Sequence, residues 1–293
     1  MSTLNEPEGR CIGILPDPGS IKALAIDLDG TVLAPGAVLT ERTAMAINKC
    51  RQKGLKIIIV TGRSIDSVEP FRSALNAEGP MVYFNGALVA EMPGSMILKV
   101  TLLDTKTVES CIDISRETGA YLQVFYLEEG KEKRIILASE WDGEEREMYR
   151  KHTGLLSELG DLKETLRRQG SGCCIKAMFL AEPEQLAMLR LRLEERLGGS
   201  IYVTQTFRTF LEIMDAGVSK GEGLKFALKS LSLRTEEVIA FGDEENDIPM
   251  LDAAGFSVAP ANAKDAAKAS ASLIVGTNSE DGVAVFLEEF FQL

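Results

Sequence analysis

Residues 21–31 read Ile-Lys-Ala-Leu-Ala-Ile-Asp-Leu-Asp-Gly-Thr, and this stretch decides the fold. Apart from one lysine its first six residues are apolar, and two aspartates one residue apart follow them. A short apolar run bounded by glycines is typical of a strand buried on both faces, as in a parallel sheet. We therefore predict a buried strand over Ile21–Leu28 with Asp27 and Asp29 at its carboxyl end.

Strand and helix patterns alternate near both ends of the chain. Near the amino end, helix patterns lie at 40–53, with Thr40 as N-cap, and at 65–75, and strand patterns lie at 56–60 and 81–84. Near the carboxyl end, helix patterns lie at 220–231, 248–254, 263–269 and 282–291, and strand patterns at 238–242, 256–258 and 273–275. This alternation predicts βαβ units, and hence an α/β fold with a doubly wound, mostly parallel, Rossmann-like sheet.

The pattern changes after Asn85-Gly86, where 87–100 reads as a hairpin that turns near Pro93-Gly94. Helices and short strands then alternate irregularly, which predicts an α+β domain inserted into the first one. The predicted organisation is an N-terminal extension at 1–20, a core domain at 21–85, an inserted domain at 86–214 and the rest of the core at 215–293.

The composition of the chain limits the classes of partner that it is expected to bind. The 293 residues are 45% apolar and 26% charged, with a formal net charge of −12. This charge argues against nucleic acid and anionic membranes as partners. The five cysteines show no CxxC spacing, the first twenty residues contain no signal-peptide pattern, and no apolar run approaches about 20 residues. We expect reduced thiols, a cytoplasmic protein and a small soluble partner.

Polar clusters follow several of the predicted strands and open one helix. They are Asp27-Leu28-Asp29-Gly30-Thr31, Thr61-Gly62-Arg63, Ser219-Lys220-Gly221 and Gly242-Asp243-Glu244-Glu245-Asn246-Asp247. Ligands of open α/β sheets bind beyond the carboxyl ends of the strands. Carboxylates crowded there repel one another, so a cation is expected, and Asp27, Asp29 and Asp243 offer the oxygen ligands that Mg²⁺ prefers. A lysine, a hydroxyl and helix N-termini suit a phosphate.

Each cluster has a plainer interpretation when taken alone. An Asp-x-Asp is often a capping turn, a Thr-Gly is often only a turn, and a lysine or an acidic loop is often solvated. Their joint occurrence in this order favours one site. Elsewhere, His152 is interpreted as a solvated surface residue rather than a catalytic one, and Arg134 and Lys176 as surface charges rather than specificity residues of the inserted domain. Trp141 is left open between a partly exposed ring and a substrate-facing one.

Together the four clusters resemble the motifs of the haloacid dehalogenase-like hydrolases, and more narrowly the Cof-type phosphatases with a type IIB cap. Asn85-Gly86-Ala87 resembles the start of the cap in that group, and Asn262-Ala263 and Glu280–Val283 resemble its C-terminal signatures. The resemblance covers Ile21 to the end of the chain.

The resemblance implies a role for each matching residue. Asp27 would attack phosphorus and become an aspartyl-phosphate, and Asp29 would act as general acid and base. Mg²⁺ would be held by the Asp27 carboxylate, the Asp29 backbone carbonyl and Asp243. Phosphate contacts would come from the Leu28 backbone, Thr61, Gly62, Lys220 and Asn246, and Asp247 would support the ligands from behind.

We therefore expect a Mg²⁺-dependent phosphatase that acts on small phosphomonoesters such as sugar phosphates. Two alternatives stay open at this point. One is a phosphomutase or phosphotransferase with the same intermediate, and the other is a non-catalytic phosphate-binding protein of the same fold. The sequence does not specify the substrate, the cap residues that select it or the oligomeric state.

Overall fold

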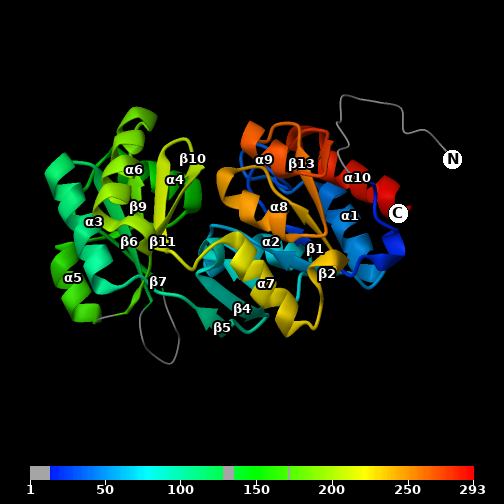
Figure 1. The fold of residues 1–293 in the computed structure, drawn as a ribbon, viewed down its shortest axis with the longest axis horizontal. Coiled ribbons are helices and arrows are strands. Elements are labelled where there is room, and N and C mark those ends of the chain that lie inside the picture. The colour runs from blue at the N-terminus through cyan, green and yellow to red at the C-terminus, as the bar shows by residue number, and fades with distance from the viewer. Residues whose placement is uncertain (1–13, 128–134, 171) are drawn as a thin grey trace. The chain divides into compact units, whose positions relative to one another are not determined.

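The computed structural model describes residues 14–127, 135–170 and 172–293. Contacts within the chain divide it into two compact units (Figure 1). The first unit comprises Met1–Thr61, Val68–Leu98 and Lys220–Leu293, and the second comprises Gly62–Ser67 and Lys99–Ser219. The predicted domain bounds stay a prediction, and most of the predicted extension lies outside the described residues.

A parallel sheet forms the centre of the first unit, as predicted. Its strands are β1 (Ala23–Ile26), β2 (Lys56–Ile59), β12 (Val238–Phe241), β13 (Phe256–Pro260) and β14 (Leu273–Val275). They lie in the order β14-β13-β12-β1-β2, and every neighbouring pair is parallel. The predicted α/β fold class is confirmed.

Helices cover both faces of this sheet because its strands are apolar on both faces. All four residues of β1 are buried. Ala23 and Ala25 belong to an apolar cluster that also contains residues of α7 (Lys220–Ser230), α8 (Ile248–Ala253) and α9 (Asp265–Ser270). On the opposite side α1 (Glu41–Gln52) packs against β2 and α10 (Gly282–Phe291). This is the doubly wound arrangement.

Local signals set the remaining elements of the first unit. The Thr40 hydroxyl accepts a hydrogen bond from the backbone N–H of Thr43 at 3.1 Å, so the predicted N-cap of α1 is confirmed. A second sheet contains β3 (Gly79–Tyr83), β4 (Leu88–Met92) and β5 (Met96–Val100), in that order. The predicted hairpin after Asn85-Gly86 is therefore present as β4 and β5.

The helix α2 (Ile65–Ala74) precedes this second sheet along the chain.

The second unit is an α+β domain built on a six-stranded sheet in the order β10-β11-β9-β6-β7-β8. The strands are β6 (Tyr121–Leu127), β7 (Ile135–Ser139), β8 (Glu158–Leu159), β9 (Cys174–Leu180), β10 (Ile201–Phe207) and β11 (Phe210–Asp215). The helices are α3 (Thr105–Thr118), α4 (Glu144–Thr153), α5 (Leu162–Gln169) and α6 (Pro183–Leu197). Residues of α3, α5 and α6 share one apolar cluster with the sheet.

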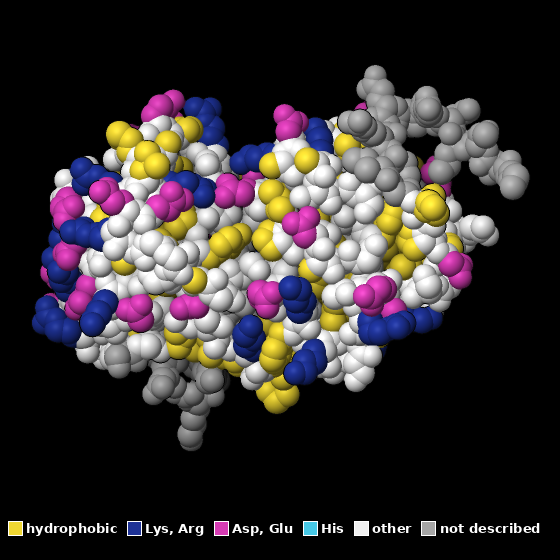
Figure 2. Space-filling view, viewed as in Figure 1, with side chains coloured by type: hydrophobic (Ala, Val, Ile, Leu, Met, Phe, Trp, Pro, Cys, Tyr) yellow, Lys and Arg dark blue, Asp and Glu magenta, His cyan; other side chains and the backbone are white. Residues whose placement is uncertain are grey.

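Charges of both signs are interspersed over α3 and α5 of this unit (Figure 2). Ion pairs join them, such as Lys163 with Asp113 at 2.6 Å and Arg116 with Asp161 at 3.0 Å. Mixed charge of this kind is typical of a solvated face, whereas a nucleic-acid surface carries a basic stripe. Among the described residues, no helix has the length and apolar character needed to cross a membrane.

Candidate active site

The register of the parallel sheet brings two of the predicted clusters to the same edge. Ile26, the last residue of β1, pairs with Phe241, the last residue of β12. The next residue, Asp27, donates its backbone N–H to the Phe241 carbonyl at 3.0 Å. Asp27 and Gly242-Asp243 therefore leave the sheet side by side, at the edge where ligands of such sheets bind.

A tight turn after β1 holds Asp243 against the first cluster. Gly30 has φ +79°, and a Cβ atom added to it would lie 2.2 Å from the Asp243 Oδ2 atom. The Thr31 hydroxyl donates a hydrogen bond to the Asp243 Oδ1 atom at 2.6 Å. Only glycine fits both the left-handed backbone and the space left by this carboxylate. The turn at Gly30 thus positions Asp243.

Lys220 opens α7 and is buried, with 1% of its surface exposed. Its ammonium donates to Asp27 Oδ1 at 2.6 Å and to Asp247 Oδ1 at 2.5 Å. Close packing of α7 makes this reach possible. A Cβ on Gly221 would lie 2.3 Å from the Pro249 carbonyl oxygen. The glycine lets the first turn of α7 approach α8 at this point.

Both carboxylate oxygens of Asp247 are hydrogen-bonded. While Oδ1 accepts from Lys220, Oδ2 accepts the backbone N–H groups of Asp243 and Glu244, each at 3.0 Å. Asp247 therefore fixes both the lysine and the loop that carries Asp243. The predicted role of Asp247 behind the metal ligands stays a prediction, with which these contacts are compatible.

Burial and crowding perturb the ionisation of these groups. Burial raises the pKa of Asp27 well above its ordinary value, although Lys220 opposes this rise and Asp247 adds to it. Burial, followed by repulsion from Asp247, raises the pKa of Asp243 to about 8. Burial would lower the pKa of Lys220, but the Asp247 and Asp27 carboxylates outweigh it and raise that pKa. The site lacks the positive charge needed to keep all its carboxylates ionised.

A divalent cation fits this set of donors. Oxygen atoms of Asp27, Asp243 and Asp247 lie within 4.8 Å of one another, and all three residues are buried. Hard oxygen donors of this kind suit Mg²⁺ or a similar cation, whose charge would favour the ionised carboxylates. Asp27 and Asp243 thus offer candidate ligands for a divalent metal, and Asp247, whose two oxygens already accept hydrogen bonds, lies beside them. The side chain of Asp29 is not in this group, but its predicted contribution is through the backbone carbonyl.

Asn85 forms hydrogen bonds with two residues that are predicted to bind phosphate, Thr61 and Asn246. Asn85, two residues after the end of β3, donates its backbone N–H to the Thr61 carbonyl at 2.9 Å. Its side-chain oxygen accepts a hydrogen bond from Asn246 Nδ2 at 2.9 Å. Thr61, Asn85 and Asn246 are all buried. The ends of β2 and β3 and the loop after β12 are thereby joined.

The structure brings Asp27, Asp243, Asp247 and Lys220 into one buried cluster. Asp29 is half-buried in the turn that follows β1, and the Leu28 side chain is fully buried, so only its backbone is available to a ligand. Gly62 begins the segment Gly62–Ser67, which belongs to the second unit.

Sequence reasoning missed the roles of several supporting residues. Thr31 holds Asp243, and the Asn262 amide donates to the Gly30 carbonyl at 2.8 Å. Asn85 was noticed only as part of the predicted cap start. Thr31 and Asn262 lie within matched motifs, but their partners are 212 and 232 residues away, and a single sequence does not show such contacts.

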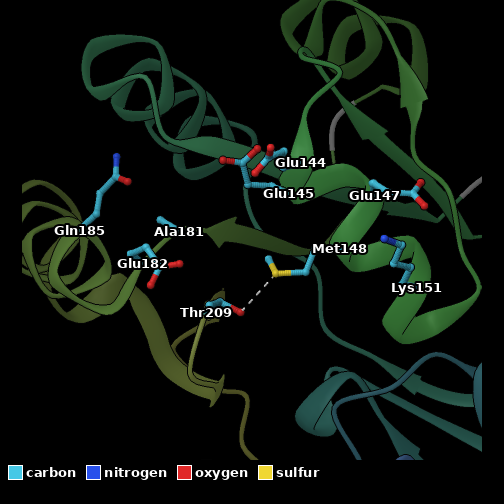
Figure 3. Close-up of a pocket in the computed structure, with 9 residues that line it drawn as sticks. All are labelled: Glu144, Glu145, Glu147, Met148, Lys151, Ala181, Glu182, Gln185 and Thr209. Atoms are coloured by element: carbon cyan, nitrogen blue, oxygen red, sulfur yellow. Dashed lines mark hydrogen bonds between the residues drawn. The ribbon is translucent and has the colours of Figure 1, made fainter.

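The second unit contains a separate cavity of about 610 Å³ at α4 and the start of α6 (Figure 3). It is lined by Glu144, Glu145, Glu147, Met148, Lys151, Ala181, Glu182, Gln185 and Thr209. Four carboxylates against one ammonium would repel a phosphate ester. None of the predicted site residues lines this cavity.

The interpretation of Lys176 as a solvated surface charge was wrong. Its side chain on β9 is 3% exposed and forms an ion pair at 2.6 Å with Glu212, whose side chain is 4% exposed. The ammonium also lies 4.7 Å from the centre of the Phe125 ring. A charge inside a protein is tolerated when it is paired in this way. Arg134 lies outside the described residues.

The interpretation of His152 as a surface residue is confirmed. His152 is exposed on α4, and its ring packs at 4.3 Å from the ring of Phe207. The exposed fraction of Trp141 is 36%, at the boundary between half-buried and exposed.

Comparison with known proteins agrees with this geometry. Residues 24–287 match the haloacid dehalogenase-like hydrolase family, and the chain belongs to it. The chain is 28% identical over 270 residues to the pyridoxal phosphate phosphatase YbhA of Escherichia coli, covering 91% of this chain and 97% of that protein. It is 30% identical over 279 residues to the 5-amino-6-(5-phospho-D-ribitylamino)uracil phosphatase YitU of Bacillus subtilis, covering 92% and 97%.

A solved structure shows that the fold is shared. The subclass IIB sugar phosphatase BT4131 aligns with a TM-score of 0.78 at 21% identity, over 93% of this chain and all of that one. The predicted resemblance to Cof-type phosphatases with a type IIB cap is confirmed. The chain is a phosphatase of this superfamily, a hydrolase that acts on small phosphate esters.

Proposed function

We propose that this protein is a Mg²⁺-dependent phosphatase that hydrolyses small phosphomonoesters through an aspartyl-phosphate on Asp27. The observation that carries the proposal is the buried Lys220 ammonium between Asp27 and Asp247, with Asp243 beside them. A carboxylate nucleophile, a cation and hard oxygen ligands are the components that phosphoryl transfer through aspartate requires.

Two displacements at phosphorus complete the reaction. In the first, a carboxylate oxygen of Asp27 bonds to phosphorus, the ester P–O bond breaks, and Asp29 gives its proton to the leaving oxygen. In the second, a water oxygen bonds to phosphorus as the Asp27–phosphorus bond breaks, and Asp29 takes the proton from that water. Inorganic phosphate leaves and the Asp27 carboxylate is restored.

Other residues of the chain bind the phosphoryl group. We assign this role to Lys220, Thr61, Asn246, Gly62 and the backbone N–H of Leu28. The Asp27 carboxylate, the Asp29 backbone carbonyl and Asp243 would hold Mg²⁺, and Asp247 would keep Lys220 and the Asp243 loop in place. The bound cation supplies charge neutralisation for the phosphoryl oxygens.

The substrate class follows from the relatives and remains part of the proposal. Pyridoxal phosphate and the phosphoribitylaminouracil named for YbhA and YitU are phosphate esters of small metabolites. We propose a substrate of the same general kind, including sugar phosphates, with the second unit acting as the cap that selects it. The predicted cytoplasmic location is kept as part of this proposal.

The test is release of inorganic phosphate from an aryl phosphate and from a panel of metabolite phosphates. Turnover should require Mg²⁺, stop with EDTA and be lost in Asp27→Asn. The exposed Asp252 of α8 provides a matched control, because Asp252→Asn makes the same chemical change away from the site. Undiminished turnover in EDTA or in Asp27→Asn would refute the mechanism. Transfer to an added alcohol, with no release to water, would indicate a phosphotransferase.

A further inference from the structure

Asn85 has an unusual backbone for a buried residue with a side chain. Phe84 and Asn85 are consecutive and both have positive φ, at +48° and +54°. Both residues are buried, and Asn85 is fully so. Left-handed backbone is uncommon outside glycine and tends to persist at functional sites, where the surrounding structure holds it in place.

This backbone places two hydrogen-bonding groups of Asn85 on two different parts of the site. The N–H group donates to the carbonyl of Thr61 at 2.9 Å, and the Thr61 N–H donates to the Val82 carbonyl at 2.9 Å. The Asn85 side-chain oxygen accepts from Asn246 Nδ2 at 2.9 Å. Thr61 and Asn246 come from different strand ends, and Asn85 is the residue that joins them.

Only one of the two polar atoms of the Asn246 side chain has a hydrogen-bond partner among the described residues. Its Nδ2 atom is bound to Asn85, while its Oδ1 atom is buried and has no hydrogen-bond partner within the described part of the chain. Buried polar atoms are nearly always satisfied, and an exception calls for a specific explanation such as a ligand or an ion. The open Oδ1 atom only accepts, so it suits a cation or a hydrogen-bond donor, whereas the Nδ2 atom carries a second hydrogen that can donate to a phosphate oxygen.

We propose that Asn85 is a positioning residue of the phosphate site, which orients the Asn246 amide through its side chain and the Thr61 turn through its backbone. The inference rests on the proposed function and extends it by a residue outside the four motifs. Asn85 need not touch the substrate, because its effect passes through the two residues that it holds.

The variant Asn85→Gly distinguishes the contribution of the side-chain hydrogen bond from that of the backbone hydrogen bond. Glycine adopts positive φ freely and keeps the N–H group that binds Thr61, so this variant removes the side-chain amide that holds Asn246 and preserves the backbone contact. Misplacing a binding group by about 1 Å can cost about 10²-fold in rate. We expect kcat/KM for an aryl phosphate to fall between about 10-fold and 10²-fold. The affinity for inorganic phosphate, measured by calorimetry, should weaken as well.

Asn76 provides the matched control. It also has positive φ, at +47°, and its amide donates to the Asn48 side chain at 2.9 Å, but on the exposed surface after α2. Asn76→Gly therefore loses a similar hydrogen bond from a similar backbone. We expect its kcat/KM and phosphate affinity to match the parent protein.

A double-mutant cycle with Asn246→Ala tests the route of the effect. If Asn85 acts through Asn246, then Asn85→Gly should cost little once the Asn246 amide is absent, because coupled residues are not additive. A general loss of structure would instead give additive effects. Additive losses, or an Asn85→Gly variant with parental kcat/KM and parental phosphate affinity, would overturn the proposal.

A different experimental result decides the proposed function. It fails when Asp27→Asn retains turnover, whatever Asn85→Gly does. The calorimetric measurement of phosphate binding needs no turnover, so it tests the Asn85 inference even then.

Discussion

Gly30→Ala tests whether the turn after β1 positions Asp243. The added Cβ would lie 2.2 Å from Asp243 Oδ2, whereas ordinary contact begins near 3.4 Å. The carboxylate must therefore retreat by about 1 Å, because φ of +79° leaves the turn little freedom to adapt. The hydrogen bond from Thr31 to Asp243, 2.6 Å long, would be stretched or broken by this movement.

The expected magnitudes follow from two separate costs. An L side chain in left-handed backbone costs about 1–2 kcal/mol. Forcing extra volume into a packed site adds about 1–3 kcal/mol. We expect the free energy of unfolding in urea to fall by about 2–5 kcal/mol, the sum of these two costs. A metal ligand displaced by about 1 Å should lower kcat/KM for an aryl phosphate by about 10²-fold.

Gly54→Ala is the control for the backbone cost. Gly54 follows α1 with φ of +96°, and a Cβ there would meet nothing within 4 Å. It should lose about 1–2 kcal/mol of stability and keep parental kcat/KM. The reasoning is refuted if Gly30→Ala keeps parental kcat/KM, or if both variants lose activity equally.

Three further changes test the electrostatic account. Lys220→Met leaves the buried Asp27 carboxylate without its cation, so it should abolish phosphate release and lower the free energy of unfolding by about 3–5 kcal/mol; parental stability in urea would contradict this. Lys176→Met should cost a similar amount in the second unit, and Lys176→Met/Glu212→Leu should recover most of it, because an apolar pair can replace a buried ion pair. A double variant no more stable than the single one would count against that interpretation. Burial raises the pKa of Asp243 from 3.8 to about 8, so this group's stabilising contribution is fully present below pH 3.8 and is lost as the pH rises toward 8. Since Mg²⁺ binds the ionised carboxylate, the Mg²⁺-induced rise in Tm should be larger at pH 8 than at pH 5.5, and an equal rise at both would show that Asp243 does not titrate with binding.

The sequence predicted the first unit well because its signals are local. A parallel strand that is buried on both faces, such as β1, reads as an apolar run whatever its neighbours are. The N-cap at Thr40 and the turn at Gly30 depend on residues within a few positions. The order of the motif clusters then predicted which strand ends would meet.

Contacts between distant segments were not predictable from one sequence. Lys176 reads as a surface residue because its partner Glu212 lies on another strand, 36 residues away. The role of Asn85 depends on an amide 161 residues along the chain.

The most direct test of the central claim is acid quenching during turnover of an aryl phosphate, followed by mapping of phosphorylated peptides. An aryl oxide leaves without needing a proton, so Asp29→Asn should still form the intermediate but hydrolyse it slowly, for lack of a general base. The account predicts that a phosphoryl group accumulates on Asp27 in Asp29→Asn and is absent in Asp27→Asn. Phosphate release by Asp27→Asn at the parental rate, with no phosphoryl group on Asp27 in any variant, would contradict it.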